Sequence, residues 1–112
     1  MDSISLKIDI KPISINYAFQ GRRFKTKKCK EYEASLWYRL PKKPMITGDV
    51  EVFFDFFLVN YKKTDISNLV KVTEDIIVKK KYIEDDRKIV KMHLSKKKSD
   101  KDMMTITIKK YD

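Results

Sequence analysis

The stretch VEVFFDFFLV, residues 50–59, decides how the rest of this 112-residue chain folds. Every second side chain is apolar, which is typical of a strand with one buried face. That face consists of Val50, Val52, Phe54, Phe56 and Leu58. The other face carries Phe53, Phe57 and Val59, so we expect it to be partly buried as well. The stretch therefore predicts the middle strand of a sheet that needs cover on both of its sides.

The segments before this strand predict one strand and one helix. Apolar and polar residues alternate over 4–10 and indicate a half-buried strand that Pro12 ends. Residues 13–25 are expected to form a polar loop. Over 26–40 apolar residues recur every three or four positions, which predicts a helix that stops at Pro41.

The segments after it predict a helix and two strands. An apolar stripe with helical periodicity begins after Asp65, which occupies the position of an N-cap, and the helix is expected to end near residues 79–81. Val90, Met92 and Leu94 indicate one face of the next strand. The run SKKKSDKD, residues 95–102, is expected to be a hairpin loop before a last strand in MMTITIKK.

The predicted order is β-α-β-α-β-β in a single domain spanning residues 1–112. It predicts an α+β fold, a four-stranded mixed sheet with two helices on one face. The other face would then lack a partner within the chain. A symmetric homodimer formed through Phe53 and Phe57 is the natural way to cover it.

The charge favours a polyanionic partner. Lys and Arg total 26 against 16 acidic residues, a formal net charge of +10, which points to nucleic acid. A lysine-rich solvated surface is the alternative explanation. No apolar run is long enough to span a membrane, and the single cysteine, Cys29, excludes an intramolecular disulfide, so we expect a cytosolic protein. Cys29 is expected in the core, and the only histidine, His93, on the surface.

Carboxylates are the remaining candidates for chemistry, because the sequence has neither a glycine-rich phosphate loop nor a Cys/His cluster. Asp65 opens the second helix, and Asp85 and Asp86 precede the third strand. Oxygen ligands of this kind bind Mg²⁺, and Lys71 on the same helix is suited to stabilise phosphoryl charge. The alternative is structural, with Asp65 as a helix cap, Asp85–Asp86 as a solvated turn, and Asn68 as a turn or cap residue.

The segment YKKTDISNLVKVTEDII, residues 61–77, followed by YIEDDRKIVKMHL, residues 82–94, resembles the RusA family of Holliday-junction resolvases. That family commonly shows Asp-x-Asp-Asn-Leu-x-Lys opening a helix and an Asp-Asp-x-x-Ile segment fifteen to twenty residues further on. The first motif matches at Asp65, Asn68, Leu69 and Lys71, and the second at Asp85, Asp86 and Ile89. Pro12 and Asn16 match a Pro…Asn loop before the family's first helix.

The resemblance implies a homodimeric endonuclease that depends on Mg²⁺, with Mn²⁺ as a substitute, and that nicks four-way or branched DNA in recombination and repair. Such proteins are often encoded by phages or prophages, so the expected setting is the cytoplasm of a bacterial or phage-infected cell. By position, Asp65 and Asp86 would bind the metal, Asp85 would flank them, and Lys71 would be the active-site lysine. Asn68 and Asn16 would have structural roles.

The chain departs from the family motif at position 67, where serine replaces the second carboxylate. A neutral hydroxyl is a weaker ligand for a hard cation. Ser67, Lys71 and Glu74 are spaced by four and three residues and would share one helical face. We therefore expect Glu74 to supply the missing charge, directly or through water. The alternative is an exposed glutamate that pairs with Lys71 in solvent.

Basic residues near these motifs are expected to contact DNA phosphates. They are Arg22, Arg23, Lys25, Lys27, Lys28, Lys62 and Lys63. Tyr61 would stack at the junction centre or pack on the sheet edge. Two rival functions stay open at this point: a branched-DNA-binding protein whose catalysis Ser67 has weakened, and a basic interaction protein of a phage particle or RNA complex whose carboxylates only cap helices.

Overall fold

The computed structural model describes residues 3–15, 19–20 and 24–112, and the fold is built from these. Its strands are β1 (Ser3–Ile8), β2 (Phe19–Gln20), β3 (Phe24–Lys25), β4 (Val50–Leu58), β5 (Ile89–Lys98) and β6 (Met103–Lys110). Its helices are α2 (Lys27–Arg39) and α3 (Val70–Lys79). The 3₁₀ turns η1 (Tyr61–Lys63) and η2 (Ile66–Leu69) lie between β4 and α3, and η3 (Asp86–Lys88) lies between α3 and β5.

The main sheet has four strands in the order β1-β6-β4-β5. β4 pairs antiparallel with β6 and parallel with β5, so the sheet is mixed and β4 is an inner strand, as its sequence predicted. Because β4 and β5 are parallel neighbours, the chain must return to the starting end of β4 between them. The segment η1-η2-α3-η3 makes this return and carries both acidic motifs.

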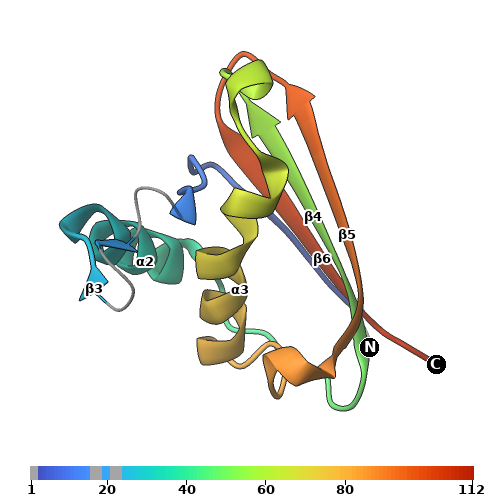
Figure 1. The fold of residues 1–112 in the computed structure, drawn as a ribbon. Coiled ribbons are helices and arrows are strands. Elements are labelled where there is room, and N and C mark those ends of the chain that lie inside the picture. The colour runs from blue at the N-terminus through green and yellow to red at the C-terminus, as the bar shows by residue number, and fades with distance from the viewer. Residues whose placement is uncertain (1–2, 16–18, 21–23) are drawn as a thin grey trace.

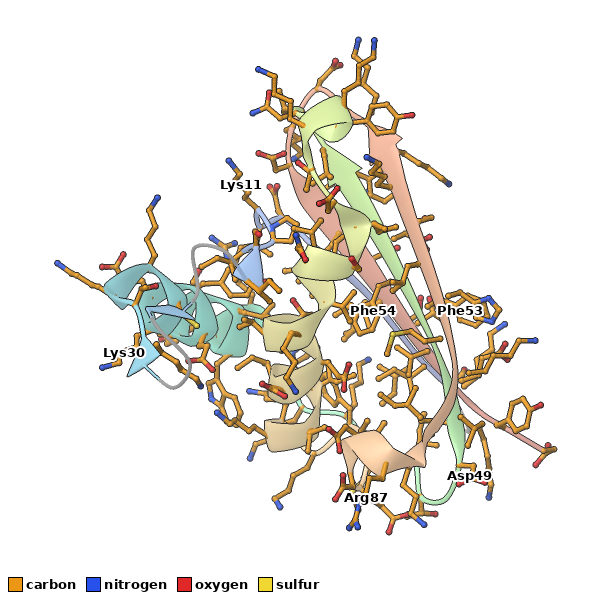
Figure 2. The ribbon with its side chains drawn as sticks, in the orientation of Figure 1. Lys11, Lys30, Asp49, Phe53, Phe54 and Arg87 are labelled. Atoms are coloured by element: carbon orange, nitrogen blue, oxygen red, sulfur yellow. The ribbon has the colours of Figure 1, made fainter. Side chains whose placement is uncertain are left out.

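The two faces of the sheet differ sharply, as the alternation in β4 predicted. Phe54 is fully buried, whereas Phe53 on the opposite face is half-buried. Figure 2 shows Phe54 pointing toward α3 and Phe53 pointing away from the helices. The hydrophobic core therefore lies between α3 and one face of the sheet, with Ile106 of β6 paired opposite Phe54 and Leu6 of β1 opposite Ile106.

Both long helices lie on this one side of the sheet, which confirms the predicted α+β architecture (Figure 1). α3 packs along the sheet and α2 packs against α3. The two helices are joined by a buried hydrogen bond of 2.8 Å between the hydroxyl oxygens of Tyr32 and Thr73. Burial raises the pKa of Tyr32 to about 12. Cys29 is buried on α2, as expected.

Two predicted loops are wrong in part. The segment 13–25, expected to be a polar loop, contains the short strands β2 and β3, and Ile13 packs against the core. The lysines of 95–98, assigned to a hairpin loop, belong to β5, and only the residues after Lys98 form the turn. An edge strand tolerates a lysine run because its side chains reach solvent, so charge alone is a poor sign of a loop.

The second helix begins later than expected. The α-helix starts at Val70, after the 3₁₀ turn η2, and the side chain of Asp65 makes no capping hydrogen bond to it. The helix ends with Lys81 in the left-handed conformation, at φ 64°. The Tyr82 and Lys81 amides donate to the carbonyls of Ile77 at 3.1 Å and Val78 at 3.0 Å, a Schellman end that turns the chain toward Asp85 and Asp86.

Within the part of the chain that the structure describes, no helix is long and apolar enough to cross a membrane.

Candidate active site

The charged side of α3 meets the turn η3. Lys71 and Glu74 project from the first half of α3, and Asp85 and Asp86 begin η3, with which α3 is in contact. The charges of Asp86 and Glu74 both act on Lys71, and the charge of Asp86 acts on Glu74. Three of the sequence-predicted site residues, Lys71, Glu74 and Asp86, therefore form one electrostatic cluster, and Asp85 adjoins it.

Glu74 is half-buried, and its surroundings disfavour its charged form. Burial raises the pKa of the Glu74 carboxyl; the Lys71 ammonium opposes this shift, while the carboxylates of Asp86 and Asp75 add to it. The pKa of Lys71 is raised in turn, first by the charge of Asp75, whose Oδ1 lies 3.3 Å from the lysine Nζ. Lys71 is thus held as a cation beside the carboxylates of Glu74 and Asp86, which repel each other.

Asp85 and Asp86 have different surroundings although they are adjacent. The Asp85 carboxylate accepts a hydrogen bond of 3.1 Å from the Arg87 amide and lies 3.4 Å from its guanidinium. Interaction with the neighbouring Asp86 carboxyl, assisted by these Arg87 contacts, lowers the pKa of Asp85 to about 2. The same interaction raises the pKa of Asp86. Asp85 is therefore tied to Arg87 within η3, while Asp86 is the carboxyl that faces Lys71.

Asp65 lies apart from this cluster. It is exposed, precedes η2, and its carbonyl accepts a hydrogen bond of 3.1 Å from the Asn68 amide. Figure 1 shows η2 and η3 at opposite ends of α3. This separation follows from the parallel pairing of β4 and β5, because the chain leaves β4 at one end of the strands and enters β5 at the other. That one cation contacts both Asp65 and Asp86 stays a prediction.

Asp65 instead lines a cavity of about 650 Å³ between the 11–14 segment, α2 and the η1–η2 segment. Basic and amide side chains surround it, namely Lys11, Lys28, Lys63 and Asn68, and Tyr32 lies in its wall. Asp102 is a second carboxylate in the lining, so the cavity combines three lysines and two amide side chains with two carboxylates.

The donor set of the cluster suits a hard divalent cation, because carboxylate oxygens are its preferred ligands and their mutual repulsion falls when a cation binds. The charge of Asp86 acts on Glu74, and that Glu74 substitutes for a carboxylate at position 67 stays a prediction. Ser67 itself is exposed on η2. Among residues 3–15, 19–20 and 24–112, no three His, Cys, Asp or Glu side chains converge closely enough to form a metal-binding group.

The lysines predicted to contact DNA differ in whether their side chains are exposed or already paired with an acidic residue. Lys62 and Lys63 are exposed on η1, beside Asp65. Lys25 is held by Glu33 at 2.8 Å, and this hydrogen bond raises its pKa. Lys27 is exposed, with its Nζ 3.9 Å from Glu31. Asn16, Arg22 and Arg23 lie outside the described residues.

Tyr61 is half-buried, with the Nζ of Lys96 4.9 Å from its ring centroid. It packs against β5 at the edge of the sheet, which was one of the two predicted alternatives. That it stacks at the centre of a junction stays a prediction.

Sequence reasoning missed three residues of this region. Asp75 is four residues after Lys71, so the helical spacing that identified Glu74 was also available for it. Lys11 lines the cavity, although the sequence analysis gave it no role. Lys96 donates hydrogen bonds to the segment before Asp65, a long-range contact for which no local pattern gives a signal.

Comparison with protein-family models matches residues 14–109 to the model described as Endodeoxyribonuclease RusA. The matched range includes both acidic motifs, α3, and every strand of the main sheet except β1. A search of curated proteins gave no match.

Proposed function

The chain belongs to the RusA family of endodeoxyribonucleases, and we propose that it nicks branched DNA, in particular four-way Holliday junctions, in a reaction that depends on Mg²⁺ or Mn²⁺. The observation that carries this proposal is the cluster of Lys71, Glu74 and Asp86 within the matched range. Two carboxylates can hold a divalent cation for hydrolysis of a phosphodiester, and a lysine cation beside them can stabilise phosphoryl charge.

Each residue of the cluster receives a distinct role. Asp86 and Glu74 would hold the cation, with Asp85 fixing the geometry of η3 through Arg87 and Asp65 contributing a further carboxylate from the cavity. A bound divalent cation would supply activation of water and neutralise charge on the leaving oxygen. Lys71, kept protonated by the acidic groups around it, would stabilise the charge on the phosphoryl group in the transition state.

The DNA backbone would run from the cluster toward the cavity that holds Asp65. Lys62, Lys63 and Lys28 would contact phosphates there, which gives affinity that falls with salt and carries little base specificity. Asn68, half-buried in the cavity wall, would hold the geometry between the loop and the helix. An activity on chromosomal or phage DNA would place the protein in the cytoplasm of a bacterial or phage-infected cell.

The open face of the sheet supports a homodimer. No helix of the described segments covers the half-buried Phe53 and Phe57 of this face (Figure 1). Glu51 and Asp55 alternate with them along β4, while Lys97 and Lys109 lie on the neighbouring strands of the same face. Acidic residues in the middle strand and basic residues beside it allow a second copy to pair opposite charges across a twofold axis.

The proposal is tested with a labelled synthetic four-way junction and Mg²⁺ or Mn²⁺. The wild type should nick the junction, and Asp86→Asn should lose at least about 100-fold in rate, because the variant keeps the shape but not the charge of the side chain. Glu74→Gln should lose a comparable amount, whereas full metal-dependent nicking by this variant would exclude Glu74 as the substitute for a carboxylate at position 67. Asp65→Asn is measured in the same assay. A loss of nicking rate would support Asp65 as a further carboxylate for the cation, and an unchanged rate would exclude it.

The second candidate function is a branched-DNA-binding protein with weakened catalysis, which the serine at position 67 favours. It predicts junction binding without metal-dependent nicks in the wild type. In that case Asp86→Asn and the wild type would be indistinguishable in the nicking assay, while Lys62→Ala and Lys63→Ala would still weaken binding.

A further inference from the structure

Lys96 occupies a position on the core side of the sheet. Its register partner on β4 is Phe56, which is fully buried, and the preceding residues of β5 on this side are Leu94 and Met92. An apolar residue is therefore expected at this position. Lys96 is half-buried there, and such a position is costly for an ammonium group unless it is hydrogen-bonded.

The ammonium of Lys96 finds its partners in the backbone that precedes Asp65. Its Nζ donates one hydrogen bond of 2.8 Å to the carbonyl of Tyr61 and another of 2.8 Å to the carbonyl of Thr64. It also lies 4.9 Å from the centroid of the Tyr61 ring. Within the described residues, no carboxylate pairs with Lys96.

The other hydrogen bonds of this segment are local. Asn60 accepts from the Lys63 amide at 3.2 Å and from the Thr64 hydroxyl at 3.0 Å, so these bonds shape the turn η1 without attaching it to the sheet. On the other side of the turn, the Val59 amide donates to Asp102 at 2.9 Å. Lys96 is thus the side chain of β5 that joins both ends of η1 to the sheet.

We propose that Lys96 is a positioning residue for the site: it fixes the backbone of residues 61–64 and thereby sets the place of Asp65 and of Lys62 and Lys63. The inference rests on the proposed nuclease function for its catalytic consequence, because Asp65 is one of the proposed carboxylates. Displacement of a reacting group by about 1 Å can cost about 100-fold in rate, so loss of this anchor should reduce the rate far more than the affinity.

The test uses Lys96→Met, which keeps the long apolar stem and removes the donors, and Lys96→Arg, which restores two donors. Lys98→Met is the matched control: Lys98 lies on the same strand and the same side and is exposed, and in the part of the chain that the structure describes it donates no hydrogen bond to residues 61–64. Single-turnover nicking at saturating enzyme is measured for each variant, together with junction affinity in Ca²⁺ and hydrogen exchange of the amides of residues 61–68.

Lys96→Met should lose about 10- to 100-fold in the saturated nicking rate, while its junction affinity should change by no more than about threefold, as for one lost phosphate contact. Amide exchange of residues 61–68 should accelerate by about tenfold in Lys96→Met. Lys96→Arg should recover most of the nicking rate and most of the protection from exchange. Lys98→Met should keep the wild-type nicking rate and exchange.

Two results would overturn the inference. One is unchanged exchange over 61–68 in Lys96→Met. The other is a loss confined to affinity, which would make Lys96 a simple phosphate contact. If the wild type does not nick any junction, the proposed function fails, and the exchange comparison alone decides whether Lys96 anchors the segment. Should Lys96→Met fail to fold, Lys96→Gln, which keeps a shorter donor, replaces it in the same comparison.

Discussion

At the scale of single residues, position 67 is where serine stands in place of the second carboxylate of the RusA motif. Ser67 is exposed on η2, so a carboxylate there would be accommodated without repacking the core. We expect Ser67→Asp to lower the Mg²⁺ concentration that gives half-maximal nicking by about tenfold, because it adds a second carboxylate beside Asp65, the proposed ligand at this end of α3, which should contribute about 1.4 kcal/mol to cation binding.

The matched control is Ser67→Asn, which has nearly the same shape without the charge and should leave the Mg²⁺ dependence as in the wild type. A titration of nicking rate against Mg²⁺ measures both variants. If the two substitutions behave alike, the charge at position 67 does not reach the cation.

Single residues were predicted best where a local spacing expressed their role. Glu74 was identified from helical spacing, and the structure places it beside Lys71 and Asp86. The same spacing argument placed Ser67 on this face by assuming one continuous α-helix, whereas residues 66–69 form a 3₁₀ turn. The contacts of Lys96 were not predictable, because they join residues more than thirty positions apart through backbone carbonyls that carry no sequence signal.

At the scale of elements, the end of α3 determines where η3 begins. Lys81 adopts φ 64°, a conformation that costs a side-chain-bearing residue about 1 kcal/mol and that glycine adopts freely. We expect Lys81→Gly to raise the free energy of unfolding by about 0.5–1 kcal/mol, since the Schellman hydrogen bonds to Ile77 and Val78 are kept. Urea denaturation followed by circular dichroism measures this change.

Lys81→Ala separates backbone strain from loss of the lysine side chain, because alanine keeps the strain. It should therefore differ from the wild type by less than about 0.5 kcal/mol. An equal gain for both substitutions would show that removal of a positive charge, and not relief of the left-handed conformation, is responsible.

Periodicity predicted the existence of the long elements, but the ends of several were misplaced for identifiable reasons. The helix after Asp65 was expected to start at once because Asp65 is a good capping residue, yet its side chain makes no cap and a 3₁₀ turn intervenes. The end of this helix near residues 79–81 was predicted correctly, whereas the left-handed conformation of Lys81 was not, since glycine is the usual residue at this position. The lysines of 95–98 suggested a loop because edge strands and loops share an exposed, charged composition.

At the scale of the whole molecule, the parallel pairing of β4 with β5 has the largest effect on the site. The mixed sheet was predicted from the order of the elements, but which strands are parallel was not. This pairing carries the chain along the full length of α3 between Asp65 and Asp86, so the two motifs that are close in the sequence lie at opposite ends of the helix (Figure 1). Local motif spacing contains no information about this separation.

The open face of the sheet leads to the last prediction, which concerns assembly. Phe53 stacks on His93 with ring centroids 4.2 Å apart and takes no part in the core, so Phe53→Asp should leave the monomer folded. In a twofold dimer through this face the substitution introduces two charges into an apolar contact, a change that costs several kcal/mol and should produce a monomer at micromolar concentration. Sedimentation velocity measures the change, with a thermal melt to confirm folding.

Tyr38→Asp provides the control, because Tyr38 is 91% exposed on α2, which lies on the other side of the sheet (Figure 1). This variant should sediment as the wild type does. The proposed dimer would have a functional consequence, since two active sites held in one dimer would cut a junction in a pair of coordinated nicks. On a plasmid that extrudes a cruciform, the wild type should therefore yield linear product and Phe53→Asp mainly nicked circles. A Phe53→Asp protein that remains dimeric would show that the second copy binds elsewhere. A wild type that is monomeric at every concentration would show that the mechanism does not use a dimer.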